Sequence, residues 1–147
     1  MRTDPVTLQA THALGRSVTV AAAGVELFTY VYRPDTPVPE SPKPYLHPVR
    51  TLGGRLMSLF RPHDHVWHKG IAWSLPHVGE HNFWGGPTYE RGRGYVQLDN
   101  NGSATHRELT ALTAGDDRVE IAHTLAWTAQ SGAPVIDERR ALTATAL

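Results

Sequence analysis

Histidines concentrate in one stretch of the chain. Five of the nine histidines in 147 residues lie within residues 63–81, and His47 lies shortly before them. In an extended backbone, His63 and His65 would place both imidazoles on one face, about 6.6 Å apart at ~3.3 Å per residue. His68 could join them from the following turn. Such a group could exchange protons near neutral pH or ligate a metal ion, so the spacing predicts a polar site here.

Three interpretations of His63, His65 and His68 are open. They could ligate a metal, act as metal-free acid–base or substrate-binding groups, or form hydrogen bonds within a loop. Bicupin-like metal sites continue with a Glu three or four residues later, where this chain has Lys69 and Gly70, and this difference weakens the metal interpretation. We therefore assign no metal ligands. Because the chain has no cysteine, any bound metal would depend on these three histidines and on carboxylates.

Polar residues around the histidines have a functional and an ordinary interpretation. Asp64 could orient an imidazole and fix its tautomer, or it could cap the turn that begins at Pro62. Arg50 offers forked donors to a carboxylate or to sugar hydroxyls, although exposed arginines are commonly just solvated. Glu138 and Arg139 could form an exposed ion pair at a strand end. The sequence leaves both interpretations open for each of these side chains.

Three tryptophans lie within residues 67–84. Trp67 and Trp84 would suit a platform for sugar rings beside two consecutive glycines, or they could pack in a core. Trp73 lies in an apolar run and fits core packing better. Aromatic rings beside several imidazoles are therefore compatible with a ring-shaped ligand.

Strand-forming residues recur along the chain, separated by turn residues. The first predicted strands, rich in β-branched and aromatic residues, are 6–12, 17–22, 25–33, 55–60, 70–75 and 95–99. Alternation of polar and apolar residues predicts three longer strands over 103–114, 116–131 and 135–147. Asn100, Asn101 and Gly102 are expected to form a hairpin turn. Many strands at short spacing predict an all-β fold, a sandwich or a barrel.

Six prolines lie within residues 34–48. They predict an extended, polyproline-like connection over the surface rather than a paired strand. We interpret it as a loop inside a single domain of residues 1–147, because the residues before it are too few to bury a core; a domain linker is the alternative. The chain stops inside a predicted strand, so we expect this domain to be the front part of a larger sandwich.

Composition excludes several classes of protein. Fourteen basic residues balance fourteen acidic ones, and no basic stripe is visible, which argues against nucleic-acid and anionic-membrane partners. The first fifteen residues contain no apolar signal segment, and the apolar run at 17–25 is about half of what a membrane span needs, so we expect a cytoplasmic protein. No phosphate loop and no serine nucleophile elbow are present.

Three motifs resemble the bacterial PmoA-like family, a domain of unknown function. They are residues 45–54, 62–70 and 82–86. Asp64, His65, His68 and Gly70 match the family's Asp-His-x-His-His-x-Gly element, and Trp67 replaces its middle histidine. A later stretch with Trp127, Gly132, Glu138 and Arg139 is also similar. The resemblance covers most of the chain from Tyr45 onward.

The resemblance implies a fold and a setting. It implies a large antiparallel β-sandwich, of the supersandwich (mutarotase-like) or jelly-roll type, in proteins about twice this length, and a role in carbohydrate catabolism. A literal methane monooxygenase is disfavoured, because a particulate subunit needs membrane spans. The candidate catalytic residues are His65, His68, His63 and Asp64, and the candidate substrate-binding residues are Arg50, His47, Trp67, Trp84 and Glu138.

These observations lead to one prediction and two alternatives. We predict a histidine-rich polar pocket that binds or acts on a small, sugar-like ligand. The alternatives are a histidine-ligated metal-dependent oxygenase or hydrolase, and a non-catalytic carbohydrate-binding module using Trp67 and Trp84. The sequence decides neither whether the protein is an enzyme nor its cofactor, substrate or oligomeric state.

Overall fold

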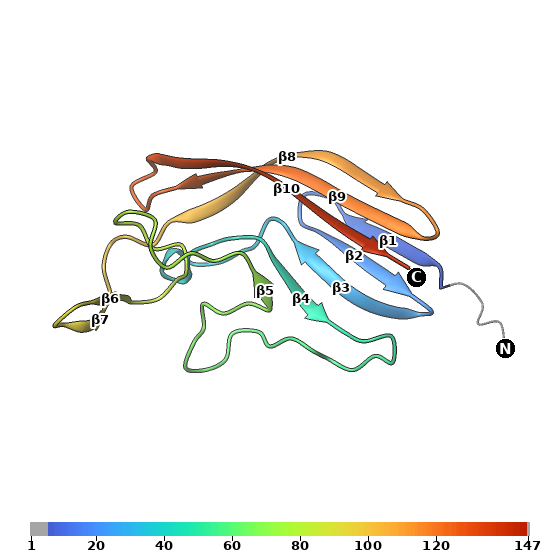
Figure 1. The fold of residues 1–147 in the computed structure, drawn as a ribbon, viewed down its shortest axis with the longest axis horizontal. Coiled ribbons are helices and arrows are strands. Elements are labelled where there is room, and N and C mark those ends of the chain that lie inside the picture. The colour runs from blue at the N-terminus through green and yellow to red at the C-terminus, as the bar shows by residue number, and fades with distance from the viewer. Residues whose placement is uncertain (1–5, 147) are drawn as a thin grey trace.

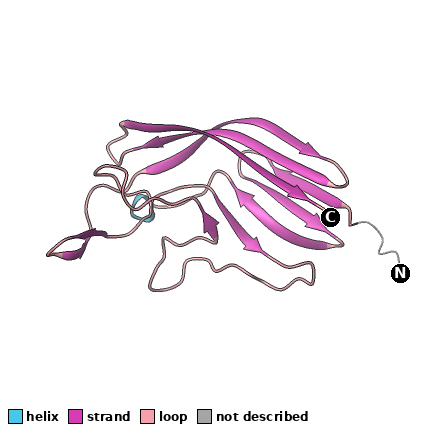
Figure 2. Cartoon of the chain, in the orientation of Figure 1, coloured by secondary structure: helices cyan, strands magenta, loops and turns pink. Residues whose placement is uncertain are grey.

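Two antiparallel β-sheets face each other in the computed structural model, which describes residues 6–146 (Figure 1). One 3-10 turn, η1 (Val38–Glu40), accompanies the strands, and no α-helix occurs in this described range (Figure 2). Residues 1–5, which belong to the stretch predicted to lack a signal segment, lie outside the description. Leu147, the end of the last predicted strand, also lies outside it.

The first sheet has the strand order β1–β2–β3–β4–β5. Its strands are β1 (Leu8–Ala13), β2 (Ser17–Ala22), β3 (Val25–Val31), β4 (Tyr45–Val49) and β5 (Ile71–Ala72). Ala23 and Gly24 both have positive φ, 50° and 77°, and this left-handed pair closes the tight turn between β2 and β3. The N-terminal part of the sheet is therefore a meander, as its sequence predicts.

The second sheet has the order β10–β9–β8. Its long strands are β8 (Ser103–Ala114), β9 (Arg118–Thr128) and β10 (Pro134–Thr145), and a separate hairpin of β6 (Thr88–Glu90) and β7 (Gly94–Val96) projects at one end (Figure 1). On β9, every second residue from Val119 to Trp127 is buried, which gives this sheet one face toward the first sheet.

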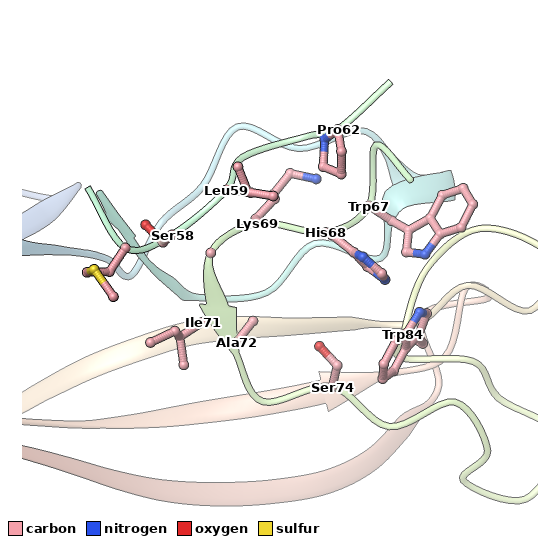
Figure 3. Close-up of a pocket in the computed structure, with 12 residues that line it drawn as sticks. Ser58, Leu59, Pro62, Trp67, His68, Lys69, Ile71, Ala72, Ser74 and Trp84 are labelled. Carbon is pink, nitrogen blue, oxygen red and sulfur yellow. The ribbon is translucent and has the colours of Figure 1, made fainter. Parts of the chain in front are cut away.

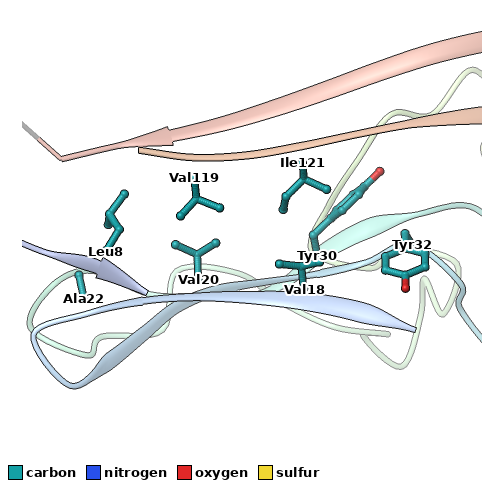
Figure 4. Close-up of a cluster of buried hydrophobic side chains, with 8 residues drawn as sticks. All are labelled: Leu8, Val18, Val20, Ala22, Tyr30, Tyr32, Val119 and Ile121. Carbon is teal, nitrogen blue, oxygen red and sulfur yellow. The ribbon is translucent and has the colours of Figure 1, made fainter. Parts of the chain in front are cut away.

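The main core lies between the two sheets (Figure 4). Its buried members are Leu8, Val18, Val20, Ala22, Tyr30, Tyr32, Val119 and Ile121. Fully burying one such aliphatic side chain contributes about 1.5–3 kcal/mol, so these contacts dominate the attraction between the sheets. A smaller cluster of Phe83, Ala104, Leu125 and Trp127 extends the core toward the loops at one end.

The predicted all-β, antiparallel class is confirmed, in the form of an open, sandwich-like arrangement. The predicted strands 17–22 and 103–114 coincide with β2 and β8. In β2, buried Val18 and Val20 alternate with Thr19 and Ala21, and such alternation over one buried face specifies register strongly.

The prediction for the proline-rich segment is wrong in part. β4 pairs with β3 and β5, and Glu40, Lys43 and Pro44 are buried instead of crossing the surface. Pro48 is tolerated inside β4 because it falls in a register shift, where it has no partner residue on β3.

Three smaller predictions are also wrong. Residues 55–60 form only isolated bridges, at Leu56 and Phe60, because no neighbouring strand runs beside them. Trp73 is 64% exposed and does not pack in the core. Asn101 is 1% exposed, and its amide hydrogen-bonds to the backbone oxygen of Gly86, so it links two segments and is not a turn residue.

Candidate functional site

A loop of residues 61–70, the histidine loop, carries the central residues of the candidate site. Two tight turns shape it: the backbone N–H of His65 donates to Pro62 O at 2.9 Å, and that of His68 donates to His65 O at 2.9 Å. The N–H of Arg61 closes the loop by donating to His68 O at 2.8 Å. The His65 and His68 rings consequently stack, with centroids 5.1 Å apart and planes 30° from parallel.

Both imidazoles line a cavity of about 730 Å³, the His–Trp cavity. It is lined by His65, Trp67, His68, Pro76, His77, Asn82, Trp84, Gly85, Pro87, Thr88, Tyr89 and Tyr95. His68 makes edge contacts with Trp84 at 5.4 Å and with Trp67 at 6.0 Å between ring centroids. The volume lies within the range of small-molecule sites, and aromatic rings form much of the wall.

Trp67 carries a buried indole N–H with no hydrogen-bond partner among the described residues. Buried donors are nearly always paired, and an unpaired one costs about 1–3 kcal/mol. The Trp67 residue that lines the cavity therefore carries an unsatisfied donor.

The environment of the imidazoles affects their proton chemistry. Burial, reinforced by the neighbouring His65 and by Lys43, lowers the pKa of His68 below its ordinary value. His68 is therefore neutral near pH 7 and can accept a proton. Asp64 Oδ2 lies 3.2 Å from His65 Nδ1, so the carboxylate orients that ring, one of the two roles its sequence position suggests.

A buried carboxylate supports the histidine loop from below. Glu40 accepts a hydrogen bond from Arg61 Nη2 at 2.6 Å and forms an ion pair with Lys69 Nζ. It therefore holds both ends of the histidine loop. Burial alone would raise the pKa of Glu40, but the hydrogen bonds from Arg61 and Lys69 outweigh it and lower that pKa. We call Glu40, Arg61 and Lys69 the Glu40 cluster.

Lys43 holds the opposite wall. Its Nζ donates at 2.9 Å to Trp84 O and at 2.9 Å to Ser41 O. Burial, with repulsion from Lys69, lowers the pKa of Lys43 to about 7. The proline-rich segment thus anchors both the histidine loop and the Trp84 segment.

Asn82 shapes the Trp84 segment itself. Its Oδ1 accepts the backbone N–H groups of Trp84 at 2.8 Å and Gly85 at 3.0 Å, while its amide donates to Gly86 O and Thr88 Oγ1. Gly86 has φ of 66°, and a Cβ there would come within 2.7 Å of the Trp67 ring. Gly86 is therefore needed so that the Trp67 indole can lie against the backbone at this position.

The structure does not bring all predicted site residues together. His63 is exposed and does not line the His–Trp cavity. His47 lies apart from it, with Nδ1 2.8 Å from Ser58 Oγ and its ring stacked on Phe60. Arg50 also stays outside, because its backbone is tied to Leu27 and Leu56 at the end of β4.

Glu138 lies on β10, away from the cavity. It accepts hydrogen bonds from Trp127 Nε1 at 2.6 Å and from Arg140 Nε at 2.6 Å, so it forms a half-buried pair with Arg140 rather than an exposed one with Arg139.

Within residues 6–146, no three His, Asp or Glu side chains are grouped so that they could hold a metal ion, and this includes His63, His65 and His68.

Sequence reasoning missed several residues of the site. Glu40 and Lys43 were hidden in a segment that its prolines assigned to the surface, and Tyr89 and Tyr95 lie on a short hairpin with no motif. His77 belonged to the histidine-rich stretch, and that density was its only signal.

The fold and the site together define an open antiparallel β-sandwich domain whose loops hold a cavity of histidines and aromatic rings. The chain belongs to DUF6807, a family of unknown function, whose model matches residues 17–147. The match makes no specific link to PmoA-like proteins. Neither the curated proteins nor the solved structures yield a match to this chain. Across the described residues, no helix has the length and apolar character that a membrane crossing requires.

Proposed function

We propose that the His–Trp cavity binds a small, carbohydrate-like ligand and that His68 exchanges a proton with it. The stacked pair of His65 and His68 beside Trp84, in a cavity of about 730 Å³, is the observation that carries the proposal. Sugar rings offer apolar C–H faces and polar edges, which suit aromatic rings next to imidazoles.

His68 is better suited than His65 to be the proton acceptor. Its lowered pKa keeps it neutral near pH 7, and its ring contacts two tryptophans. His65 is paired with Asp64, so we assign it to ligand positioning. The resemblance to PmoA-like proteins, and with it a role in carbohydrate catabolism, is part of the same proposal.

Ligand binding to matched variants tests this function. Isothermal titration calorimetry with a panel of monosaccharides and methyl glycosides should detect binding to the wild type. His68→Ala and Trp84→Ala should each weaken binding at least about tenfold, because each removes a wall of the cavity. His63→Ala is the control, since it removes an exposed imidazole of the same loop and should leave affinity unchanged; near-UV circular dichroism checks folding.

The outcomes separate the remaining functions. Loss of binding in Trp84→Ala but not in His65→Ala or His68→Ala would favour a binding module without catalysis. Turnover of a bound sugar, followed by ¹H NMR and abolished in His68→Ala, would favour an enzyme. If no sugar of the panel binds to the folded wild type, the carbohydrate proposal is rejected.

A further inference from the structure

A second cavity lies directly beside the His–Trp cavity (Figure 3). Its volume is about 510 Å³, and we call it the aliphatic cavity. It is lined by Met57, Ser58, Leu59, Pro62, Trp67, His68, Lys69, Gly70, Ile71, Ala72, Ser74 and Trp84. Trp67, His68 and Trp84 line both cavities, so the two hollows adjoin along one wall.

The two cavities differ in the chemistry of their linings. Away from the shared wall, the His–Trp cavity has two imidazoles and two tyrosines, whereas the aliphatic cavity has the side chains of Met57, Leu59 and Ile71. These three side chains are all exposed in the described structure, Leu59 to 75%. Large apolar side chains exposed next to one another are unusual unless they bind something.

Lys69 and Ser58, two polar residues that line the aliphatic cavity, already have hydrogen-bond partners. The Lys69 ammonium is bound to Glu40 and to Val66 O, and Ser58 Oγ pairs with His47 Nδ1 and accepts the N–H of Val49. Lys69 therefore offers the cavity mainly its hydrocarbon stem. What this cavity presents to a ligand is largely apolar surface.

His68 lies where the two cavities meet. Figure 3 shows its ring next to Trp67 and facing the space toward Trp84, with Ile71 and Leu59 farther along the same hollow. A ligand that filled both cavities would pass the His68 ring at the point where its two parts are joined.

We propose that the ligand is an amphiphilic conjugate, a sugar-like ring in the His–Trp cavity joined to an alkyl substituent in the aliphatic cavity. This inference rests on the proposed carbohydrate function and specifies its ligand class. It places the bond between ring and substituent against His68. An alkyl glycoside is the simplest molecule of this class.

Affinities for a matched pair of ligands test the inference. Methyl β-glucoside and octyl β-glucoside, with the octyl ligand kept below its micelle concentration, share the ring and differ only in the alkyl chain. We expect the octyl compound to bind at least about tenfold more tightly, because burying two methylene groups suffices for that gain. The double variant Leu59→Ser/Ile71→Ser should abolish the gain and leave methyl glucoside affinity unchanged.

A methyl signal reports occupancy of the aliphatic cavity directly. The chain has only two methionines, so ¹³C-methyl labelling gives two signals, and Met57→Leu assigns the one in the cavity. Octyl glucoside and octan-1-ol should both shift the Met57 signal, and methyl glucoside should not. Leu14→Ser is the control variant, because it makes the same leucine-to-serine change outside the cavity. Leu14 is 86% exposed and lies on the turn after β1.

Each outcome decides a different part. Equal affinity for the two glucosides with an unmoved Met57 signal overturns the inference while the proposed sugar binding stands. A second outcome is that octan-1-ol shifts the Met57 signal, octyl glucoside binds no better than octan-1-ol, and methyl glucoside does not bind. That outcome overturns the proposal of an amphiphilic conjugate and also rejects glucose as the sugar ring. An octyl gain that persists in Leu59→Ser/Ile71→Ser also overturns the inference.

Discussion

His65 and His68 share a stacked arrangement but have different surroundings. His65 pairs with Asp64 at the loop surface, and His68 lies against two tryptophans. The lowered pKa of His68 has burial as its first cause and the charge of His65 as its second. Differences of this kind let two identical side chains take different roles in one site.

Removing His65 should therefore raise the pKa of His68. In His65→Asn, the neighbouring positive charge is absent and burial alone remains as the main cause of the lowered value. A pH titration of the His68 ring signals by NMR measures the change. His63→Asn serves as the control, and an unchanged His68 pKa in His65→Asn would contradict the electrostatic coupling.

At Gly86, the addition of a single Cβ atom should change both stability and the position of Trp67. Gly86→Ala should destabilise the protein by more than about 2 kcal/mol and displace Trp67, because φ is positive and the new Cβ meets the indole ring. Urea denaturation and tryptophan fluorescence measure both effects. Gly92→Ala has a similar positive φ, 84°, but open space around it, so it should cost only about 1 kcal/mol of backbone strain. Equal losses would refute the packing explanation.

Single residues also show where sequence reasoning fails. The histidine stretch predicted the right loop, because so many imidazoles in a short segment are unusual. Glu40 could not be predicted, since its burial depends on Arg61 and Lys69, which are more than twenty residues away. Trp73 and Asn101 were misassigned because residue type alone does not tell which way a side chain faces.

Among the elements, the segment from η1 to β4 has the largest influence on the site. Through Glu40 and Lys43 it contacts both walls of the His–Trp cavity, although its prolines suggested a peripheral loop. Burying charges is costly, and this arrangement is stable only because each charge has partners. Removal of one partner should therefore affect the histidine loop as a unit.

Glu40→Ala should destabilise the protein by about 3–5 kcal/mol, because it leaves the buried Lys69 ammonium unpaired. Urea denaturation measures the loss, and hydrogen exchange should show faster opening of residues 61–70. The double variant Glu40→Leu/Lys69→Met should recover most of the stability, since it removes both charges. A double variant as unstable as Glu40→Ala would refute this explanation.

An exposed ion pair supplies the comparison. Glu90 and Arg93 pair three residues apart at the surface of the β6–β7 hairpin. Glu90→Ala should cost less than about 1 kcal/mol, because solvent screens exposed pairs. A loss as large as that of Glu40→Ala would show that burial is not the deciding factor.

The long strands and the meander of β1, β2 and β3 were predictable from the sequence, whereas β4 and β6 were not. Each of the strands β8, β9 and β10 is eleven or twelve residues long and has one face toward the core. Alternation of polar and apolar residues over such a length rarely arises by chance. Residues 55–60 are also rich in apolar residues, but their side chains line a cavity or face solvent. Composition predicts a strand in both cases, and only the presence of a neighbouring strand distinguishes them.

Across the whole molecule, a polar network joins the two sheets inside the core. Tyr30 Oη lies 2.8 Å from His123 Nε2, His123 Nδ1 lies 2.9 Å from His106 Nδ1, and Arg140 Nη1 donates to Tyr30 Oη at 3.2 Å. Arginine can only donate, so the Tyr30 proton is free to go to His123 Nε2. His123 then carries its proton on Nδ1 and donates it to His106 Nδ1, so each of these three contacts has one donor and one acceptor.

Protonation of His123 would remove its acceptor and break this chain. Burial, with repulsion from His106 and Arg140, lowers the pKa of His123 to about 4, and burial also lowers that of His106. Tyr32 and Glu138 also lie close: the Tyr32 ring contacts both histidines, and the charge of Glu138 opposes the shift of His123. The network therefore favours neutral histidines between the sheets.

Stability should consequently fall in acid. The unfolded chain binds a proton at His123 below about pH 6.5, whereas the native state binds it only near pH 4, so stability is complete above pH 6.5 and is lost as pH falls. We expect a loss of order 2 kcal/mol between pH 7.5 and pH 5, measured by urea denaturation. ¹⁵N NMR should show the Nδ1–H tautomer of His123 at pH 7.

Two further measurements test the predicted loss of stability in acid. His63→Gln, at an exposed position, should keep the pH dependence of the wild type. Equal stability of the wild type at pH 7.5 and pH 5, or titration of His123 near its ordinary pKa of 6.5, would contradict the role of the network.

The walls of the two cavities come from segments that are far apart in the chain. Glu40 meets Lys69 across 29 residues, and Lys43 meets Trp84 across 41. Hairpins such as β1–β2 and β8–β9 close short loops and can form early, whereas contacts of this separation form late, after the larger loss of chain entropy. The site is therefore expected to be among the last parts of the molecule to assemble, so a ligand that fits it would bind only chains that have completed folding.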